Sequence, residues 1–230
     1  SSRRETELER VKTICLQNCD QCFILPLDLT AYSNFKDLAK LVIDKYGKID
    51  LLLNNGGVSQ RSLISETDIE IDKKVFDINF FGSVALTKAV LPYMLDVKSG
   101  HIAVMSSIVG KFGFPQRSAY SASKHALHGF METLHAENGK DGINTTVIIP
   151  GRIHTNISMN AITSTGDKHN IMDHGQSGGL TAERAAIKII KALKRNKKEV
   201  LIGRSDLLMV HIRRFFPWLY YRIVSKVQPR

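Results

Sequence analysis

The sequence is poor in cysteine and has neither a long apolar run nor a leader-like start. Its three cysteines, Cys15, Cys19 and Cys22, lie in one short stretch with no other cysteine or histidine near them in sequence. Free thiols in a reducing intracellular compartment are therefore expected; zinc is the weaker alternative, so no metal site is predicted. No stretch of 18 apolar residues occurs, so no membrane-spanning helix is expected. Ser1–Glu5 has a basic pair without a following apolar segment, unlike a signal peptide.

Net charge is absent from most of the chain. The formal charge of +10 comes from residues 188–230, which hold 12 basic and 2 acidic residues, whereas residues 1–187 hold 20 of each. A nucleic-acid-binding surface would distribute its charge more widely, so no nucleic-acid partner is expected.

A Pro/Gly/Ser-rich linker and internal repeats are also missing. With 230 residues, 43% of them apolar, the chain can bury one good core. We predict one domain over residues 1–206, followed by a basic, aromatic tail over residues 207–230.

Short apolar runs alternate with longer periodic segments along the chain. The expected strands are 22–27, 49–53, 101–106, 144–149 and 199–202. The expected helices are 4–17, 31–46, 66–78, 80–96, 117–138 and 181–195. Short, wholly apolar strands between helices are typical of a parallel sheet covered on both faces, so we predict a doubly wound, Rossmann-type α/β fold.

Polar residues and glycines follow four of these strands: Asp28, Asn54–Gly57, Ser106–Ser107 and Pro150–Thr155. Ligands of doubly wound folds bind beyond the carboxyl ends of the strands. These positions therefore predict the binding site.

Two Tyr-x-x-x-Lys pairs occur, Tyr32/Lys36 and Tyr120/Lys124, and neither is specific by itself. Context separates them. Tyr120 opens a long helix, Lys124 lies one turn further on the same face, and Ser107 stands at the end of the preceding strand. Tyr32 has no such hydroxyl, so we interpret it as an ordinary helix-surface residue.

Five motifs together resemble the short-chain dehydrogenase/reductase family, in the family's order and over nearly the whole chain. They are Asn54-Asn55-Gly56-Gly57, where the family usually has alanine for one glycine, Asn79 within 75–82, Ser106-Ser107, Tyr120-Ser121-Ala122-Ser123-Lys124, and Pro150-Gly151-Arg152-Ile153-His154-Thr155. The loop 163–180 and the tail narrow the resemblance to the subgroup of dehydrogenase/reductase member seven and its B-type relative.

The resemblance implies an oxidoreductase that interconverts a ketone or aldehyde and its alcohol. Residues 156–180 would form the lid, where Met159, Ile162, Ile171 and Met172 suggest an apolar substrate. Tyr120 would exchange the proton, Lys124 would lower the pKa of Tyr120 and hold the nicotinamide ribose, and Ser107 would fix the substrate oxygen. Asn79 would organise a water that relays protons to Lys124. The plainer alternatives are a strand-end hydroxyl for Ser107 and a helix N-cap for Asn79.

The resemblance also implies a dinucleotide cofactor. Asn54 and Gly56 would pack against adenine and ribose, Asp28 would meet the adenine amino group or cap a helix, and Arg3 would neutralise a 2′-phosphate unless it is only a solvated charge. NADP is therefore favoured over NAD. The nicotinamide clamp would comprise Pro150, Gly151, Ile153 and Thr155, together with the shared residues Tyr120 and Lys124.

No glycine-rich pyrophosphate turn is present in the sequence. The chain is therefore expected to start after the family's first β-α-β unit, whose first strand would lie between the strands ending at Asp28 and Asn54. An intact mass of 25.7 kDa, that of the 230 residues alone, would contradict this hypothesis.

The remaining expectations concern partners. The family pairs subunits through the helices 80–96 and 117–138, so a homodimer or tetramer is expected, with Val84, Leu91, Leu127, Phe130 and Leu134 as candidate contacts. Residues 207–224 would pack near the substrate entrance, lie on an anionic membrane or cover a partner subunit. The alternative function is a non-catalytic binding or scaffold protein with the same fold. A basic nucleic-acid binder would rest on the tail alone.

Overall fold

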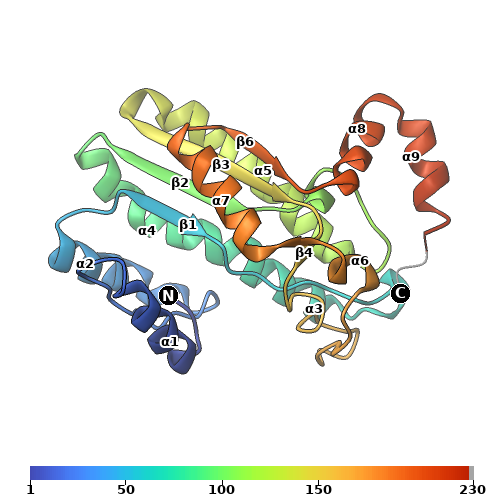
Figure 1. Cartoon of the computed structure of the whole chain (residues 1–230), viewed down its shortest axis with the longest axis horizontal. Helices are drawn as coiled ribbons and strands as arrows, with labels where there is room; N and C mark the ends of the chain where they lie inside the picture. The colour runs from blue at the N-terminus through green and yellow to red at the C-terminus, as the bar shows by residue number, and fades with distance from the viewer. Residues whose placement is uncertain (228–230) are drawn as a thin grey trace.

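The computed structural model describes residues 1–227, which form a parallel sheet between helices (Figure 1). The sheet has four strands in the order β1-β2-β3-β6. Their bounds are β1 Leu51–Asn54, β2 Gly100–Met105, β3 Ile143–Pro150 and β6 Glu199–Ile202. Four of the five predicted strands are therefore confirmed within a residue or two.

The inner strands are apolar on both sides because helices cover both faces of the sheet. Ile102, Val104 and Ile148 are fully buried, and β2 pairs with β3 over six residues, from Gly100 with Ile143 to Met105 with Ile148. This burial is the reason for continuous rather than alternating hydrophobicity in these strands.

Helices α2 (Phe35–Tyr46), α4 (Gly82–Asp96) and α5 (Ser118–Asn138) cover one face, and their apolar side chains form one core with β2 and β3. Helix α7 (Ala182–Lys194) packs on the other face through Ala185. Helix α1 (Glu5–Cys15) has no buried residue and lies beside α2 at one end of the molecule (Figure 1).

The two predicted helices 66–78 and 80–96 are one continuous run. Helix α3 (Ile69–Phe76) passes through a π-helical turn, η3 (Asp77–Phe81), directly into α4. Among the described residues this run, Ile69–Asp96, is the one with the length and mean hydropathy of a membrane span, a property that core helices share. Here Val75 and Met94 are buried inside the protein.

The predicted strand 22–27 is wrong for the described residues. Its backbone makes only an isolated bridge from Pro26 to Ser2, with Leu27 N–H donating to Ser2 O at 3.0 Å. A strand persists in a parallel sheet only where neighbouring backbone pairs with it. Apart from Ser2, no backbone pairs with residues 22–27 in the part of the chain that the structure describes.

The side of the sheet beside β1 is correspondingly open. Strand β1 is an edge strand, and Leu51 and Leu53 are 45% and 39% exposed. On α7, Ile187 and Ile190 are 66% and 52% exposed. These apolar surfaces contrast with the closed packing around β2 and β3.

The tail folds into two short helices, α8 (Leu208–Phe215) and α9 (Pro217–Val224), because Pro217 stands at the first position of the second helix. Tyr220 is buried and packs on Phe112, with a hydroxyl hydrogen bond to Gly113 O. The tail thereby joins the apolar cluster that contains Tyr120.

Two of the proposed subunit contacts are core residues. Leu127 and Leu134 are buried in the cluster beneath the sheet, whereas Val84, Leu91 and Phe130 are half-buried. The expected contact face on α5 is therefore narrower than the sequence pattern predicts, since helical periodicity marks apolar positions without distinguishing core from interface.

Candidate active site

Two serines end strand β2 and face helix α5. Ser106 Oγ donates to Lys124 O at 3.1 Å and lies 2.8 Å from His128 Nε2. Ser107 Oγ accepts from Val109 N–H at 3.4 Å and donates to Pro150 O at 3.5 Å. The strand end is thus fastened to α5 by Ser106, and Ser107 is left beside the phenol of the helix.

Tyr120 lies on the first turn of α5 and is 7% exposed. Burial raises the pKa of its phenol, while a hydrogen bond with Ser107 and the positive charges of Arg61 and Arg117 lower it. The predicted pairing of Tyr120 with Ser107 is present in this geometry. The two arginines were not foreseen from the sequence.

Lys124 is 4% exposed, and its Nζ donates to Met105 O at 2.7 Å. Nζ lies 5.8 Å from the centroid of the Tyr120 ring, so the ammonium sits over the ring. Burial lowers the pKa of Lys124 to about 8. In this geometry the groups that lower the phenol pKa are Ser107 and the two arginines, which differs from the sequence expectation for Lys124.

Asn79 is fully buried within the π-helical turn, so the N-cap alternative is wrong: the helix continues through it. Its side chain clamps Val58, accepting from Val58 N–H at 2.8 Å and donating to Val58 O at 2.9 Å. It also donates to Ser123 Oγ at 3.1 Å. The turn thereby ties the loop after β1 to α5, and π-helical turns are frequent at functional sites.

A row of four buried polar residues, Ser59–Ser62, was missed by the sequence reasoning. The side chain of Gln60 accepts from Ala119 N–H at 2.9 Å and from Tyr120 N–H at 3.3 Å. It satisfies backbone donors at the start of α5 that have no partner within the helix. The sequence signal that could have revealed them is the run of four consecutive polar residues shortly after the glycine pair that follows β1.

Asn54 and the glycines after it bring bare backbone to the same site. Asn54 Nδ2 donates to Thr87 Oγ1 at 3.1 Å, while its buried Oδ1 has no partner within the described protein. A Cβ at Gly57 would lie 2.9 Å from Asn79 Oδ1 and 3.3 Å from Lys124 Nζ. A Cβ at Gly56 would meet Leu29 at 2.5 Å.

These features fit a ribose-bearing cofactor. The Lys124 ammonium has three donors and one hydrogen-bond partner, and the orphaned Asn54 oxygen is an acceptor. A dinucleotide has hydroxyls that match both groups. The predicted cofactor residues at the strand ends are therefore chemically suitable.

Arg3 and Asp28 lie together at the exposed end of the site, with Arg3 Nη1 3.9 Å from Asp28 Oδ2. Asp28 also accepts from Thr30 N–H at 2.9 Å, and this bond, with that from the Thr30 hydroxyl, lowers its pKa. The carboxylate caps the turn before residue 31, close to the helix-cap alternative, and its other oxygen faces Arg3.

The segment after β3 turns sharply at Gly151. A Cβ there would collide with Asp206, whose Oδ2 accepts from Arg152 N–H at 2.7 Å. Pro150 ends β3 opposite Ile202, Ile153 begins the two-residue strand β4 (Ile153–His154), and Thr155 is exposed. The predicted clamp residues thus leave the sheet at the same edge as Ser107.

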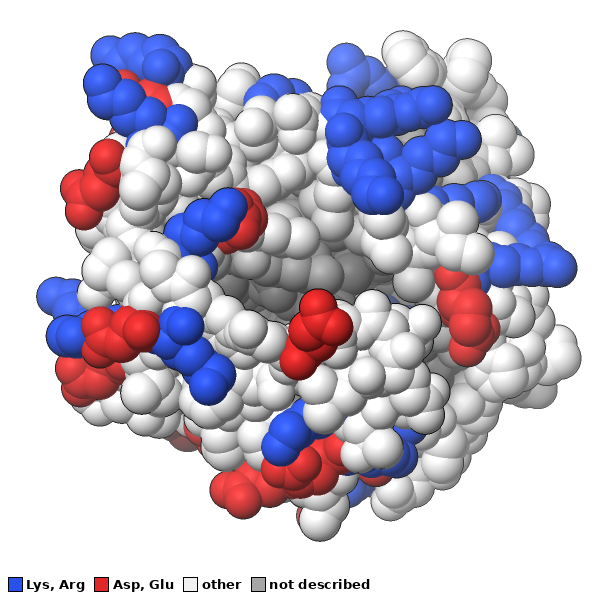
Figure 2. Space-filling model, turned by 60° about the vertical axis from the view of Figure 1, so that its left-hand side comes forward, with Lys and Arg blue, Asp and Glu red and all other residues white. Residues whose placement is uncertain are grey.

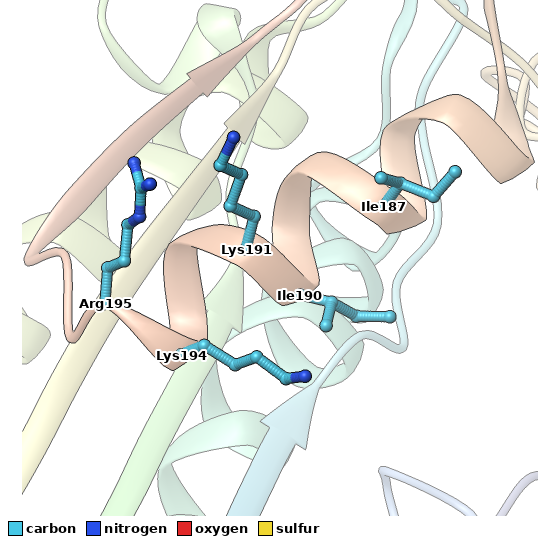
Figure 3. Close-up of a pocket in the computed structure, with 5 residues that line it drawn as sticks. All are labelled: Ile187, Ile190, Lys191, Lys194 and Arg195. Atoms are coloured by element: carbon cyan, nitrogen blue, oxygen red, sulfur yellow. The ribbon is translucent and has the colours of Figure 1, made fainter.

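The surface has hollows away from the strand-end site. A cavity of about 350 Å³ on α7 is lined by Ile187, Ile190, Lys191, Lys194 and Arg195 (Figure 3). None of these residues belongs to the strand-end site. Figure 2 shows a further hollow on the side toward α1 and α2, with an uncharged interior and charged residues around its rim.

Comparison with known proteins defines the family. The short chain dehydrogenase profile matches residues 1–165. "Dehydrogenase/reductase SDR family protein 7-like" of Drosophila melanogaster is 39% identical over 98% of this chain and 71% of that protein. "Dehydrogenase/reductase SDR family member 7B" of Mus musculus is 42% identical over 89% of this chain and 64% of that protein. The chain belongs to the short-chain dehydrogenase family, a family of oxidoreductases, and its relatives are those that the sequence motifs predicted.

Solved structures agree on the fold. A short chain dehydrogenase/reductase from Burkholderia phymatum in complex with NAD matches with a TM-score of 0.81 at 21% identity, over 100% of this chain and 86% of that chain. ElxO with NADP bound matches with a TM-score of 0.63 at 28% identity, over 66% and 62%. The predicted Rossmann-type α/β fold is confirmed.

Proposed function

We propose that the protein is an NADP(H)-dependent oxidoreductase that interconverts an apolar ketone or aldehyde and its alcohol, with Tyr120 as general acid and base. The observation that carries the proposal is the placement of the Tyr120 phenol beside Ser107 at the carboxyl end of β2, with Lys124 over its ring. The bound dinucleotide would supply or accept the hydride.

Tyr120 donates its hydroxyl proton to the carbonyl oxygen during reduction and accepts it back during oxidation. Ser107 donates a hydrogen bond to the same oxygen and holds it near the phenol. Lys124, fixed by Met105 O, offers its remaining donors to cofactor hydroxyls and keeps a positive charge over the Tyr120 ring. Asn79 keeps Val58, and therefore the glycine pair before it, close to Lys124.

The preference for NADP rests on Arg3. Its exposed guanidinium stands beside Asp28, where an adenine ribose would lie in the resemblance, and a guanidinium pairs well with a phosphate. ElxO was solved with NADP and the Burkholderia phymatum protein with NAD, so relatives of this fold use either cofactor.

We infer that a further strand, carrying the pyrophosphate-binding turn, pairs with the open edge of β1. Leu51 and Leu53 are exposed on β1, and residues 22–27 lack a ladder partner among the described residues. Mass spectrometry of the intact cellular protein tests the inference: a mass well above 25.7 kDa is expected, and 25.7 kDa would refute it.

The substrate class is inferred from the segment after Thr155. Ile162 is buried against Tyr120, while Met159 and Ile171 are more than one-third exposed around it. Absorbance at 340 nm, the NADPH band, should fall when the full-length protein meets some member of a panel of steroid, retinoid and lipid-derived ketones. NADPH binding without turnover across the panel would favour the scaffold alternative.

We further propose that the tail touches an anionic membrane. Phe216 and Trp218 are 54% and 65% exposed, Arg213, Arg214 and Arg222 accompany them, and no acidic residue follows Asp206. Aromatic residues with arginines and no acids suit an anionic lipid interface.

Co-sedimentation with phosphatidylserine vesicles tests the membrane contact. The double variant Phe216→Ser/Trp218→Ser should lose binding, and the equally exposed pair Ile187→Ser/Ile190→Ser should keep it. Equal binding of both variants would remove the tail from the contact. A homodimer or tetramer remains our proposal for the assembly, with Val84, Leu91 and Phe130 as its half-buried apolar contacts; light scattering of the full-length protein would measure it.

A further inference from the structure

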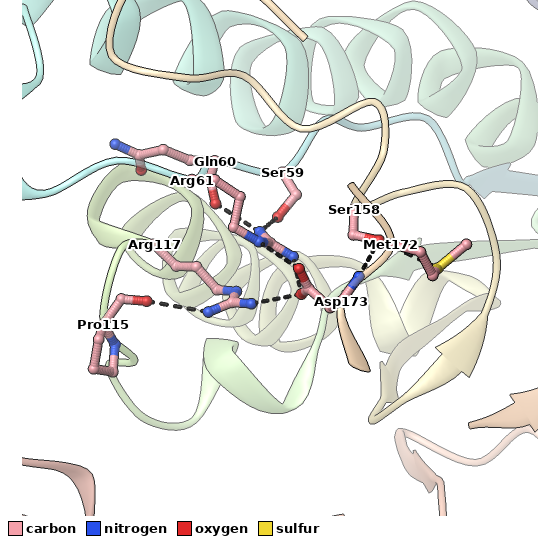
Figure 4. Close-up of polar contacts among 8 residues, drawn as sticks. All are labelled: Ser59, Gln60, Arg61, Pro115, Arg117, Ser158, Met172 and Asp173. Atoms are coloured by element: carbon pink, nitrogen blue, oxygen red, sulfur yellow. Dashed lines mark hydrogen bonds and ion pairs between the residues drawn. The ribbon is translucent and has the colours of Figure 1, made fainter. Parts of the chain in front are cut away.

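Three charged side chains from distant parts of the sequence meet in the structure (Figure 4). Two of them, Arg61 and Arg117, act electrostatically on the Tyr120 phenol. Arg61 Nη2 lies 2.6 Å from Asp173 Oδ2, and Arg117 Nη2 lies 2.8 Å from the same oxygen. All three side chains are at least 85% buried. We call Arg61, Arg117 and Asp173 the arginine cluster.

The cluster joins three elements of the site. Arg61 belongs to the loop after β1, Arg117 directly precedes α5, and Asp173 ends the covering segment, defined here as residues 156–173. Arg61 also donates to Ser59 Oγ at 2.7 Å and to Gln60 O at 2.6 Å, so its guanidinium is fixed. Arg117 is fixed by Pro115 O at 3.1 Å and by stacking on Phe114.

The covering segment is also held to the loop after β1 at Ile162. Ile162 N–H donates to Ser59 O at 2.8 Å, and Arg61 N–H donates to Ile162 O at 2.8 Å. Within the segment, Ser158 Oγ accepts from Asp173 N–H at 3.2 Å, which ties its two ends to each other. Ile162 thereby reaches the apolar cluster around Tyr120. Asp173 supplies the side-chain charge by which the segment is paired to the rest of the site.

The charges do not cancel. Two arginines share one carboxylate, which leaves one surplus positive charge in a buried place. An uncompensated buried charge destabilises the folded protein, so its presence here calls for an explanation. The phenol of Tyr120 is the nearby group that would gain from it, because a positive charge stabilises phenolate.

We propose that the arginine cluster is a positioning device with two roles: Asp173 fastens the covering segment over Tyr120, and the surplus charge of Arg61 and Arg117 stabilises the Tyr120 phenolate. The second role rests on the proposed function, whereas the first is independent of it.

Other charged or titratable side chains face the region of the arginine cluster and Tyr120, and they are left unchanged in the variants below. They are Lys124 on α5, Asp72 on α3, which contacts Gln60 at 3.5 Å, His169 in the covering segment, and Tyr220 and Arg213 in the tail. None of them bonds to the guanidinium groups of the cluster in the described structure, so substitutions within the cluster change its charge selectively.

The fastening role is tested by limited trypsin digestion of the full-length protein, without any substrate. Lys168 is an exposed cleavage site inside the covering segment. Asp173→Asn should speed cleavage after Lys168 by about tenfold, the effect of roughly 1.4 kcal/mol on local opening. The matched control is Asp20→Asn, which removes an exposed carboxylate far from Lys168 in sequence, and it should cleave at the wild-type rate. Equal rates for both variants would overturn the fastening role.

The charge role is tested by the pH dependence of alcohol oxidation, whose rate rises as Tyr120 loses its proton. Asp173→Asn raises the surplus charge, so the rise should move to lower pH by about half a unit to one unit. Arg61→Gln removes the surplus, so the rise should move to higher pH. The double variant Arg61→Gln/Asp173→Asn restores the surplus of one charge and should return the rise toward its wild-type position.

Loosening of the segment alone would move both single variants in the same direction, and that result would overturn the charge role. If Asp173→Asn fails to fold, Arg117→Gln, which also removes the surplus, should move the rise to higher pH by about as much as Arg61→Gln, and an unmoved rise in both variants would overturn the charge role. Absence of turnover with every alcohol would count against the proposed function, while the digestion would still decide the fastening role.

Discussion

The two halves of the candidate site differ in how they are held. Around β2, β3 and α5, buried side chains cross-link the elements, as when Asn79 clamps Val58 and Gln60 caps α5. Around Arg3 and Asp28, the elements are joined by an exposed ion pair at 3.9 Å and an isolated β-bridge. The chemistry half is rigid because β2 and β3 pair on both sides, and the half near Arg3 is open because residues 22–27 pair with Ser2 alone among the described residues.

The largest expected effect on activity comes from removing one oxygen atom, the Tyr120 hydroxyl, from the rigid half. Tyr120→Phe should lower turnover by about a thousandfold or more, since general acid–base catalysis contributes roughly 10²–10⁴. The dissociation constant for NADPH, measured by fluorescence, should stay within about twofold of the wild type. Near wild-type turnover would remove Tyr120 from the mechanism.

Two matched truncations compare the stability of the halves. Ile148 is fully buried on β3, whereas Leu53 on β1 is 39% exposed. Ile148→Ala should lower the free energy of unfolding by about 2–5 kcal/mol, and Leu53→Ala by about 1 kcal/mol or less in the 230-residue chain. Urea unfolding gives both values. A large cost for Leu53→Ala in the intact cellular protein would mean that another element covers β1 there.

The open half, around Arg3 and Asp28, is tested by the preference for NADPH over NADH. Arg3→Glu should weaken NADPH binding by about tenfold, roughly 1.4 kcal/mol, with NADH binding unchanged, because the lost partner is the 2′-phosphate. Equal loss for both dinucleotides, measured by fluorescence titration, would contradict the assignment of Arg3.

The smallest expected effect is a pH dependence of stability that arises from a histidine. It belongs to the rigid half, since residues 1–100 contain no histidine. Burial lowers the pKa of His128 to about 4, from an ordinary value of 6.5. Between these values the unfolded chain binds a proton that the folded protein resists, so stability should fall as pH drops from 6.5 to 4 and then level off. His128→Gln should flatten that slope in urea unfolding at pH 7 and pH 5; an unchanged slope would exclude His128.

Helical and strand periodicity was sufficient to find β1, β2, β3 and β6, because each is an apolar run whose pairing needs only other such runs. The same reasoning failed at residues 22–27, where the pattern is that of a strand but pairing depends on a neighbour outside the run. It also divided the helix at Asn79, because a π-helical turn leaves no mark in hydrophobic periodicity.

Residue types at short, characteristic spacings were enough to predict the family and the parallel fold, and to propose Ser107, Tyr120 and Lys124 as one site. What surrounds the phenol could be seen only in the folded chain. Arg61 and Arg117 precede Asp173 by 112 and 56 residues, and no local pattern predicts that they meet. Electrostatic effects on a buried group depend on distances in space, which the order of residues along the chain does not specify.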